Sequence, residues 1–194
     1  GNWTPTVHLS SQSGNKLKFD EIISAFIPNQ SRQNETAVGS ANGSFTLKKS
    51  LEDGFHKGFE VSNKLTKKNI KSDTPSSNEK NYGKHEKFWC MPLPKNKDYK
   101  RCVDFQNDVY VSDIELAIRE GFRSIEHVKR YTTLGMATDQ GKTSNLNGLQ
   151  LVSNIEDKIV PEVGHTTFRP PYTPVTIGAI VGREVGKHYR PTRK

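Results

Sequence analysis

The sequence has little apolar content and no long hydrophobic run. Hydrophobic residues make up 32% of its 194 residues, too few for one large core, so we expect two modest cores joined by a polar segment. No run of about 18 apolar residues is present, so we expect no membrane-spanning helix. The sequence also lacks a starting Met and a basic leader followed by an apolar run, and we expect a cytoplasmic piece of a longer polypeptide.

Cysteine and paired catalytic residues are equally scarce. The two cysteines are Cys90 and Cys102, and without a secretory context free thiols are favoured over a disulfide. A zinc site using both thiols and His85 would lack a fourth ligand at suitable spacing, so no metal site is predicted. The six histidines are scattered, outside any nucleophile or acid–base arrangement, and we predict no catalytic residue.

Positive charge predominates, with 29 Lys and Arg against 21 Asp and Glu and a net charge of +8. The lysines cluster at 64–71 and 80–100 among Ser, Asn and Thr. Aromatic residues spaced for base stacking are missing there, which argues against a nucleic-acid partner. A solvated linker explains these clusters, and a basic surface that docks acidic partner proteins or anionic cofactors is the functional alternative.

The first third of the sequence predicts short strands and then one amphipathic helix. The segments expected to be extended are residues 1–10, 17–23 and 25–28. A turn of small residues at 37–45 leads into a helix with apolar residues at three- to four-residue spacing from Leu47 to Leu65. Gly54 and Gly58 lie inside this helix. Glycines there cost helix stability, so the pair indicates close approach by another backbone or a ligand.

Three short helices are predicted after a polar linker at residues 67–85. The first begins at a capping box formed by Ser112 and Glu115 and ends at Gly121. The remaining predicted elements are an extended segment at 101–111, a second helix capped by Ser124, a third helix at 146–153, and an extended stretch beyond Pro161 anchored by Phe168 and Tyr172.

The segment Lys129–Asn145 carries the most functional information. It contains two glycines, three basic side chains and a run of hydroxyls where one predicted helix ends and the next begins. Such a segment offers backbone N–H groups and positive charge to an anion, typically a phosphate. Gly and Thr also form ordinary turns, and cations at helix ends are often only solvated, so the structural interpretation stays open.

Together with its flanks at 105–109 and 167–174, this segment resembles the alpha subunits of heterotetrameric sarcosine oxidases. The resemblance extends over nearly the whole chain and fades around residues 66–100. It implies an α+β fold in four parts. These are the end of a dinucleotide-binding flavoprotein domain at 1–66, a linker at 67–85, a small helical domain at 86–160, and an extended connector at 161–194 toward an absent aminomethyltransferase-like domain.

The resemblance also implies two cofactor-bordering sites. The turn before the first long helix would border a nicotinamide dinucleotide through Gly39, Ser40, Phe45 and Leu47. These are otherwise ordinary turn and helix-start residues.

The second site would face a flavin phosphate at the interface of the alpha and beta subunits. Arg130 and Lys142 would supply charge there, and Thr132, Thr133 and Thr143 would supply hydroxyl groups.

The helical domain is similar to bacterioferritin-associated ferredoxins, which hold a [2Fe–2S] cluster with four cysteines. The matching positions are Asp104, Gln106, Asp139 and Ser144. Because cluster ligation needs thiolates, we predict that no iron–sulfur cluster forms here. Asp139 is expected to cap the following helix and Ser144 to bond locally. The loss of the cysteines favours an oxidase over related dehydrogenases.

The activity implied for the whole family member is oxidative demethylation of sarcosine to glycine, with hydrogen peroxide as a product. FAD, a covalently held FMN, NAD and tetrahydrofolate would serve the complete complex, and the partners would be the beta, gamma and delta subunits. Amine oxidation would occur in the beta subunit, so this piece alone would be inactive. The alternatives are the matching subunit of a proline, opine or dimethylglycine dehydrogenase, and a non-catalytic basic interaction module.

Overall fold

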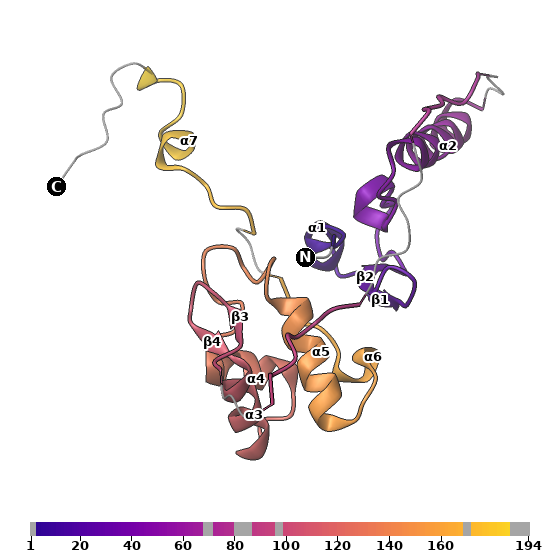
Figure 1. Cartoon of the computed structure of the whole chain (residues 1–194). Coiled ribbons are helices and arrows are strands. Elements are labelled where there is room, and N and C mark those ends of the chain that lie inside the picture. Colours follow the sequence, from indigo (N-terminus) through magenta and orange to yellow (C-terminus); the bar gives the residue numbers. More distant parts are fainter. Residues whose placement is uncertain (1–2, 68–71, 80–86, 96–98, 169–171, 187–194) are drawn as a thin grey trace.

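The computed structural model describes residues 3–67, 72–79, 87–95, 99–168 and 172–186. Within these residues the chain is α+β and mostly helical, with two small antiparallel sheets. An N-terminal hairpin lies beside a helical domain, and one long helix and the C-terminal connector project from this body (Figure 1). The predicted fold class is therefore confirmed at the level of α+β.

The N-terminal part contains helix α1 (His8–Gln12) and a hairpin of β1 (Leu17–Asp20) and β2 (Ala25–Pro28). The Asp20 carboxylate closes the turn by accepting the N–H groups of Ile22 at 2.9 Å and Ile23 at 3.2 Å. The two strands are confirmed. The prediction that residues 1–10 are extended is wrong at its end, because α1 begins at His8.

A one-turn 3-10 helix, η1 (Gly39–Asn42), precedes the long helix α2 (Leu47–Thr66). Thr46 caps α2 by accepting the N–H of Lys49 at 3.3 Å. The predicted helix is confirmed, but no residue of α2 is buried. A Cβ built on Gly54 or Gly58 would meet no described atom within 4 Å. The close approach expected at these glycines is therefore absent among the described residues.

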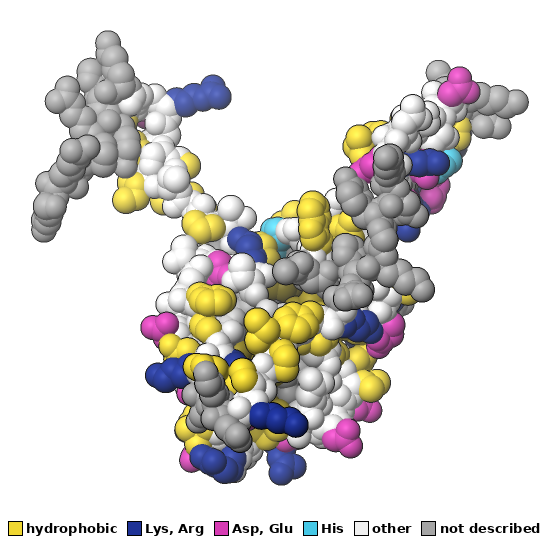
Figure 2. Space-filling view, viewed as in Figure 1, with side chains coloured by type: hydrophobic (Ala, Val, Ile, Leu, Met, Phe, Trp, Pro, Cys, Tyr) yellow, Lys and Arg dark blue, Asp and Glu magenta, His cyan; other side chains and the backbone are white. Residues whose placement is uncertain are grey.

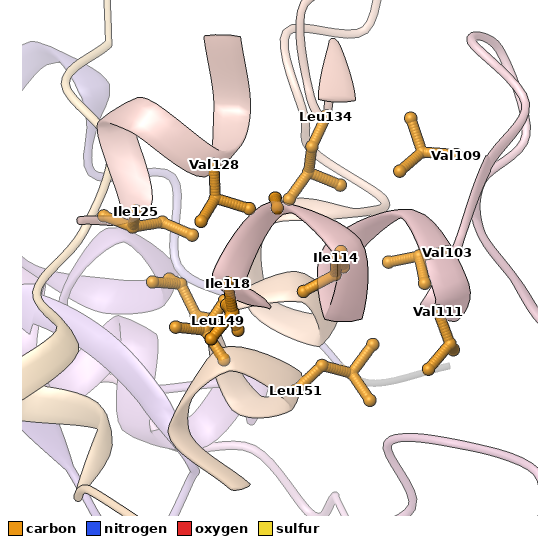
Figure 3. Close-up of a cluster of buried hydrophobic side chains, with 12 residues drawn as sticks. Val103, Val109, Val111, Ile114, Ile118, Ile125, Val128, Leu134, Leu149 and Leu151 are labelled. Atoms are coloured by element: carbon orange, nitrogen blue, oxygen red, sulfur yellow. The ribbon is translucent and has the colours of Figure 1, made fainter. Parts of the chain in front are cut away.

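The helical domain begins with a hairpin of β3 (Cys102–Asp104) and β4 (Val109–Tyr110). The helices α3 (Val111–Arg119), α4 (Ile125–Thr132) and α5 (Asn145–Glu156) follow. Figure 3 shows how their apolar side chains meet around Ile114 of α3, which is fully buried. The cluster consists of Val103, Val109, Val111, Ile114, Ala117, Ile118, Ile125, Val128, Leu134, Leu149, Leu151 and Val152.

The start of α3 differs from the prediction. The residue preceding the helix is Tyr110, and its N–H donates to Asp113 Oδ2 at 2.8 Å. The capping box assigned to Ser112 and Glu115 is therefore wrong, because β4 runs directly into the helix and buries Val111 in the core. The segment 101–111 is a hairpin rather than a single extended stretch.

The other two helices of the domain are close to the prediction. Ser124 precedes α4 as predicted, but its side chain makes no cap hydrogen bond. The third helix, α5, is longer than the predicted 146–153 and begins after Ser144. Asp139 does not cap it.

The connector after residue 160 contains two short helices, α6 (Val160–Val163) and α7 (Ile177–Val181). The prediction that it is wholly extended is wrong, and Pro161 fits the first turn of α6 because the missing proline N–H needs no helical partner there. Glu126 Oε1 accepts the Thr167 N–H at 2.8 Å and ties the connector to α4. Among the described helices, none combines the length and the hydrophobicity that a membrane crossing requires.

Candidate functional site

The four positions that match cluster cysteines in the resemblance come together in the fold. Ser144 Oγ donates to Asp104 Oδ2 at 3.3 Å. The Asp139 N–H donates to Gln106 Oε1 at 3.3 Å. We call these four residues the polar network. They come from the β3–β4 turn and from the loop between α4 and α5, so the network joins two segments that are more than 30 positions apart.

Asp104 is the centre of the network and is buried, with 2% of its surface exposed. Its Oδ1 accepts the N–H groups of Gln106 at 2.9 Å and Asn107 at 3.3 Å. Its Oδ2 accepts the Gly135 N–H at 2.8 Å in addition to the Ser144 hydroxyl. A buried carboxylate is tolerated when such donors replace water. Asp104 therefore holds the β3–β4 turn against the α4–α5 loop.

Asp139 organises the second half of that loop. Its Oδ1 accepts the Gly141 N–H at 3.0 Å, and its Oδ2 accepts the Thr143 hydroxyl at 2.7 Å and N–H at 3.2 Å. Burial opposes ionisation of Asp139, but these hydrogen bonds and the charge of Lys142 outweigh it and hold the pKa of the carboxyl below its usual value. Asp139 thus caps a local turn.

Two glycines enclose the side chain of Asn145 beneath the loop. Gly135 has a φ of +67° and Gly141 a φ of +74°, both in the left-handed region. A Cβ on either residue would collide with Asn145 Oδ1. Asn145 Nδ2 in turn donates to Thr166 Oγ1 at 3.1 Å and links the loop to the connector. Glycine is therefore required at both positions for conformational and steric reasons.

The polar network does not fit an iron–sulfur cluster. Its members offer carboxylate, amide and hydroxyl oxygens, and both carboxylates are already hydrogen-bonded to backbone N–H groups. The two thiols lie outside the network and are not joined to each other. Cys90 Sγ accepts a hydrogen bond from Arg101 at 3.3 Å, and burial, followed by the nearby Asp108 and Asp104 carboxylates, raises the pKa of Cys102. Among the described residues, no group of three His, Cys, Asp or Glu side chains could hold a metal ion.

The hydroxyls predicted to bind phosphate make contacts within α4 and the loop that follows it. Thr132 Oγ1 donates to the Val128 carbonyl at 2.7 Å, and Thr133 Oγ1 donates to the Thr132 carbonyl at 2.5 Å. Thr143 is bonded to Asp139, as described above. Arg130 forms an ion pair with Glu126, one helical turn earlier on α4, with 3.8 Å between Nη2 and Oε2. Ion pairs of this kind at a protein surface contribute little stability.

Lys142 occupies a different setting from Arg130. Its Nζ donates to the Tyr172 carbonyl at 3.2 Å and lies 4.3 Å from the centre of the Tyr172 ring. The His8 ring stacks on the Tyr172 ring, with the two ring centres 4.1 Å apart. Burial, and then the charge of Lys142, lowers the pKa of His8.

These contacts lie at a seam between the N-terminal part, the loop and the connector. A pocket at this seam is lined by Lys142 and Asn145 and, from the other two parts, by Pro5, Phe26 and Tyr172. Arg130 is not among the residues that line it. The predicted phosphate-binding set is therefore divided between the exposed end of α4 and this seam. Tyr172 is an anchor, as predicted.

The predicted dinucleotide-bordering residues surround the start of α2. Gly39 is buried with a φ of +62°, and a Cβ there would lie 3.6 Å from the Ser50 side chain. The Phe45 ring packs edge-on against Trp3, with centres 6.3 Å apart, and Ser40 and Leu47 are exposed. The left-handed φ favours glycine at position 39, whereas a Cβ there would make only ordinary van der Waals contact with Ser50.

The backbone N–H groups at the start of α2 hold a carboxylate. Leu47 and Lys48 both donate to Glu79 Oε2. The sequence does not predict this contact, because Glu79 belongs to the polar linker, where the composition indicates no fixed partner. The contact shows that this end of α2 accepts negative charge, as the N-terminus of a helix does.

Comparison with known proteins finds similarity to sarcosine oxidase alpha subunits. Residues 98–183 match the profile of the sarcosine oxidase A3 domain. The whole chain aligns with sarcosine oxidase subunit alpha of Rhizobium meliloti (strain 1021) at 36% identity and of Corynebacterium sp. (strain P-1) at 35% identity. The corresponding subunit of Corynebacterium sp. (strain U-96) is 34% identical. The chain spans 20% of the length of each of these relatives.

A solved structure shares the fold. The crystal structure of L-proline dehydrogenase from P. horikoshii superposes with a TM-score of 0.65. The match covers 93% of this chain and 37% of that one, at 20% sequence identity. At this identity the similarity concerns the fold alone.

Proposed function

We propose that this chain serves as a scaffold in a sarcosine oxidase. The premise is its homology to part of the sarcosine oxidase alpha subunit. In the complete cytoplasmic enzyme, sarcosine is demethylated to glycine in the beta subunit, oxygen is reduced to hydrogen peroxide, and tetrahydrofolate receives the one-carbon unit. FAD, FMN and NAD serve that enzyme, together with beta, gamma and delta subunits. This chain contributes a dinucleotide-bordering turn and an interface, and no catalytic residue.

The polar network carries this proposal. Asp104 and Ser144 form a buried hydrogen-bonded contact at positions where an electron-carrying relative would need thiolates. The network therefore supports a helical domain that positions neighbouring parts of the enzyme without carrying electrons. Flavin-to-oxygen chemistry needs no such carrier in this domain, which favours an oxidase. The shared fold with L-proline dehydrogenase is the observation that keeps a dehydrogenase subunit as the second candidate.

The dinucleotide-bordering role rests on the turn before α2. Gly39 takes a left-handed φ of +62° in this turn, and the first N–H groups of α2 hold a carboxylate. A turn beside a dinucleotide needs backbone N–H groups at a helix start that bind an anion, and the bond to Glu79 shows that these groups do so. In the complete subunit Gly39→Val should lower the NAD content and leave the flavin content unchanged.

The phosphate-facing role now rests mainly on Lys142. It lines the seam pocket, whereas Arg130 pairs with Glu126 on the surface of α4. We therefore propose that Lys142→Met lowers FMN retention in the assembled complex and that Arg130→Met does not. Equal retention in both variants would leave the loop with a structural role.

The assembled complex tests the whole proposal. The subunit that contains this chain would be expressed with its beta, gamma and delta partners and assayed for peroxide production with sarcosine, L-proline, an opine and dimethylglycine. We expect oxygen-dependent turnover of sarcosine. Turnover of proline with an electron acceptor other than oxygen would favour the dehydrogenase instead. Failure of the chain to join any flavoprotein complex would favour an interaction module.

A further inference from the structure

A hollow on the surface of the helical domain is lined by exposed apolar side chains. Its volume is about 630 Å3. The exposed apolar residues that line it are Phe88, Met91, Leu93, Tyr99 and Phe105. We call this hollow the apolar groove. On the face shown in Figure 2, hydrophobic side chains gather over the helical domain with Lys and Arg side chains beside them.

The groove is built on the domain core. Val111 and Leu151 belong to the buried cluster and line the groove as well. The segment that carries Phe88 and Met91 is held there by the bond from Arg101 to Cys90, and Cys90 packs against the core. The groove is therefore part of the folded domain.

The exposure of these side chains needs a reason. Phe105 is 80% exposed and Phe88 67% exposed, and they line the same hollow. Single exposed apolar residues are ordinary, but several gathered in one concave patch mark an interaction site. Aromatic residues supply most of the binding energy in such sites when a partner covers them.

The charges of the groove point to the chemistry of its occupant. Lys100 and Arg101 line it, and no Asp or Glu is among its described lining residues. Arg101 is half-buried and lies 3.8 Å from Glu115, and exposed Lys100 lies over the Tyr110 ring. A partner that fits would combine apolar anchors with carboxylates that meet these two cations.

The groove also adjoins the site described above. Phe105 separates Asp104 from Gln106, so one wall of the groove belongs to the β3–β4 turn that the polar network holds in place. A partner seated in the groove would therefore contact the rigid part of the domain. The apolar stripe of α2 is not part of such a surface, because its residues line neither this groove nor the seam pocket.

We propose that the apolar groove is the docking site for an apolar segment bearing Asp or Glu side chains from a companion subunit. This inference rests on the proposed function, since it assumes that companion subunits exist. Apolar contacts would provide the affinity, and Lys100 and Arg101 would fix the orientation and raise the association rate.

The test measures binding of the 194-residue chain to its purified companion subunits. The double variant Phe88→Ser/Phe105→Ser should weaken binding at least about tenfold, as expected for loss of interfacial aromatic anchors. Ile22→Ser is the matched control, because Ile22 is 85% exposed on the N-terminal hairpin and lies outside the groove. Thermal unfolding of each variant would show that the domain stays folded.

Charge reversal at the groove provides a second, independent test of this docking site. Lys100→Glu should weaken binding and reduce its salt dependence, whereas Lys18→Glu, at an exposed position of β1, should do neither. Wild-type binding that survives the groove variants unchanged would overturn the docking site and leave the proposed function intact. Failure of the wild-type chain to bind any companion subunit would contradict both. Self-association lost in the groove variants would identify a second copy as the occupant and overturn the proposal.

Discussion

The helical domain and helix α2 both carry apolar side chains at regular spacing, but the domain buries them and α2 does not. The domain buries twelve residues in one cluster, and its loops are closed by the polar network. Helix α2 is 20 residues long, carries an apolar stripe and buries none of it. The first region is stabilised by its buried contacts. Helix α2 is held near its start by Ser44 and Glu79 and otherwise depends more on local helix formation, which is weak for a single helix in water.

The largest effect should come from the glycines of the domain. Gly141→Ala combines a left-handed φ with a collision against Asn145, so it should reduce the free energy of unfolding by about 3 kcal/mol. Gly54→Ala in α2 meets open space and should instead increase local helix stability by about 1 kcal/mol. Urea unfolding followed by circular dichroism measures both. Destabilisation by Gly54→Ala would indicate a tight contact at α2 and would contradict the contrast drawn between α2 and the helical domain.

A smaller effect should follow from removing one carboxylate in each region. Asp104→Asn leaves a buried N–H without its acceptor and should cost about 2 kcal/mol. Asp20→Asn affects a similar turn in the N-terminal hairpin, where the N–H groups can bond to water, and should cost less than about 1 kcal/mol. The same unfolding experiment compares them. Equal losses would mean that burial of Asp104 adds nothing to its role.

The smallest effect should be the pH dependence contributed by Asp139. Its pKa is lowered in the folded state, so its stabilising contribution is complete above the unfolded pKa and is lost as the pH falls through the folded pKa. The stability difference between wild type and Asp139→Asn should therefore shrink on acidification below about pH 4. A difference that grows on acidification would contradict the assigned hydrogen bonds.

Apolar spacing together with cap residues was sufficient to predict the helices α2 to α5 approximately and the two extended segments that form β1 and β2. The start of α3 was mispredicted because Ser112 and Glu115 match the capping pattern, whereas the burial of Val111 moves the helix start forward. The helices of the connector, α6 and α7, were not predicted, because they are only four and five residues long and show no helical period.

The candidate site was predictable only in part. The resemblance assigned the four positions of the polar network, but the burial of Asp104 was not predictable, because it depends on a Gly135 N–H donor 31 positions away. The contact of Glu79 with α2 was unpredictable, because a carboxylate in a polar linker has many possible partners. Lys142 and Arg130 were indistinguishable as loop cations until the fold placed one of them at the seam.

The most direct test of the scaffold role is iron and sulfide analysis of the purified chain after anaerobic reconstitution. Four oxygen-bearing residues, with Asp104 already saturated by backbone and hydroxyl donors, should leave the protein colourless and free of stoichiometric iron. An absorbance spectrum recorded on the same sample would show this result. Stoichiometric iron and sulfide with a matching charge-transfer spectrum would contradict the account.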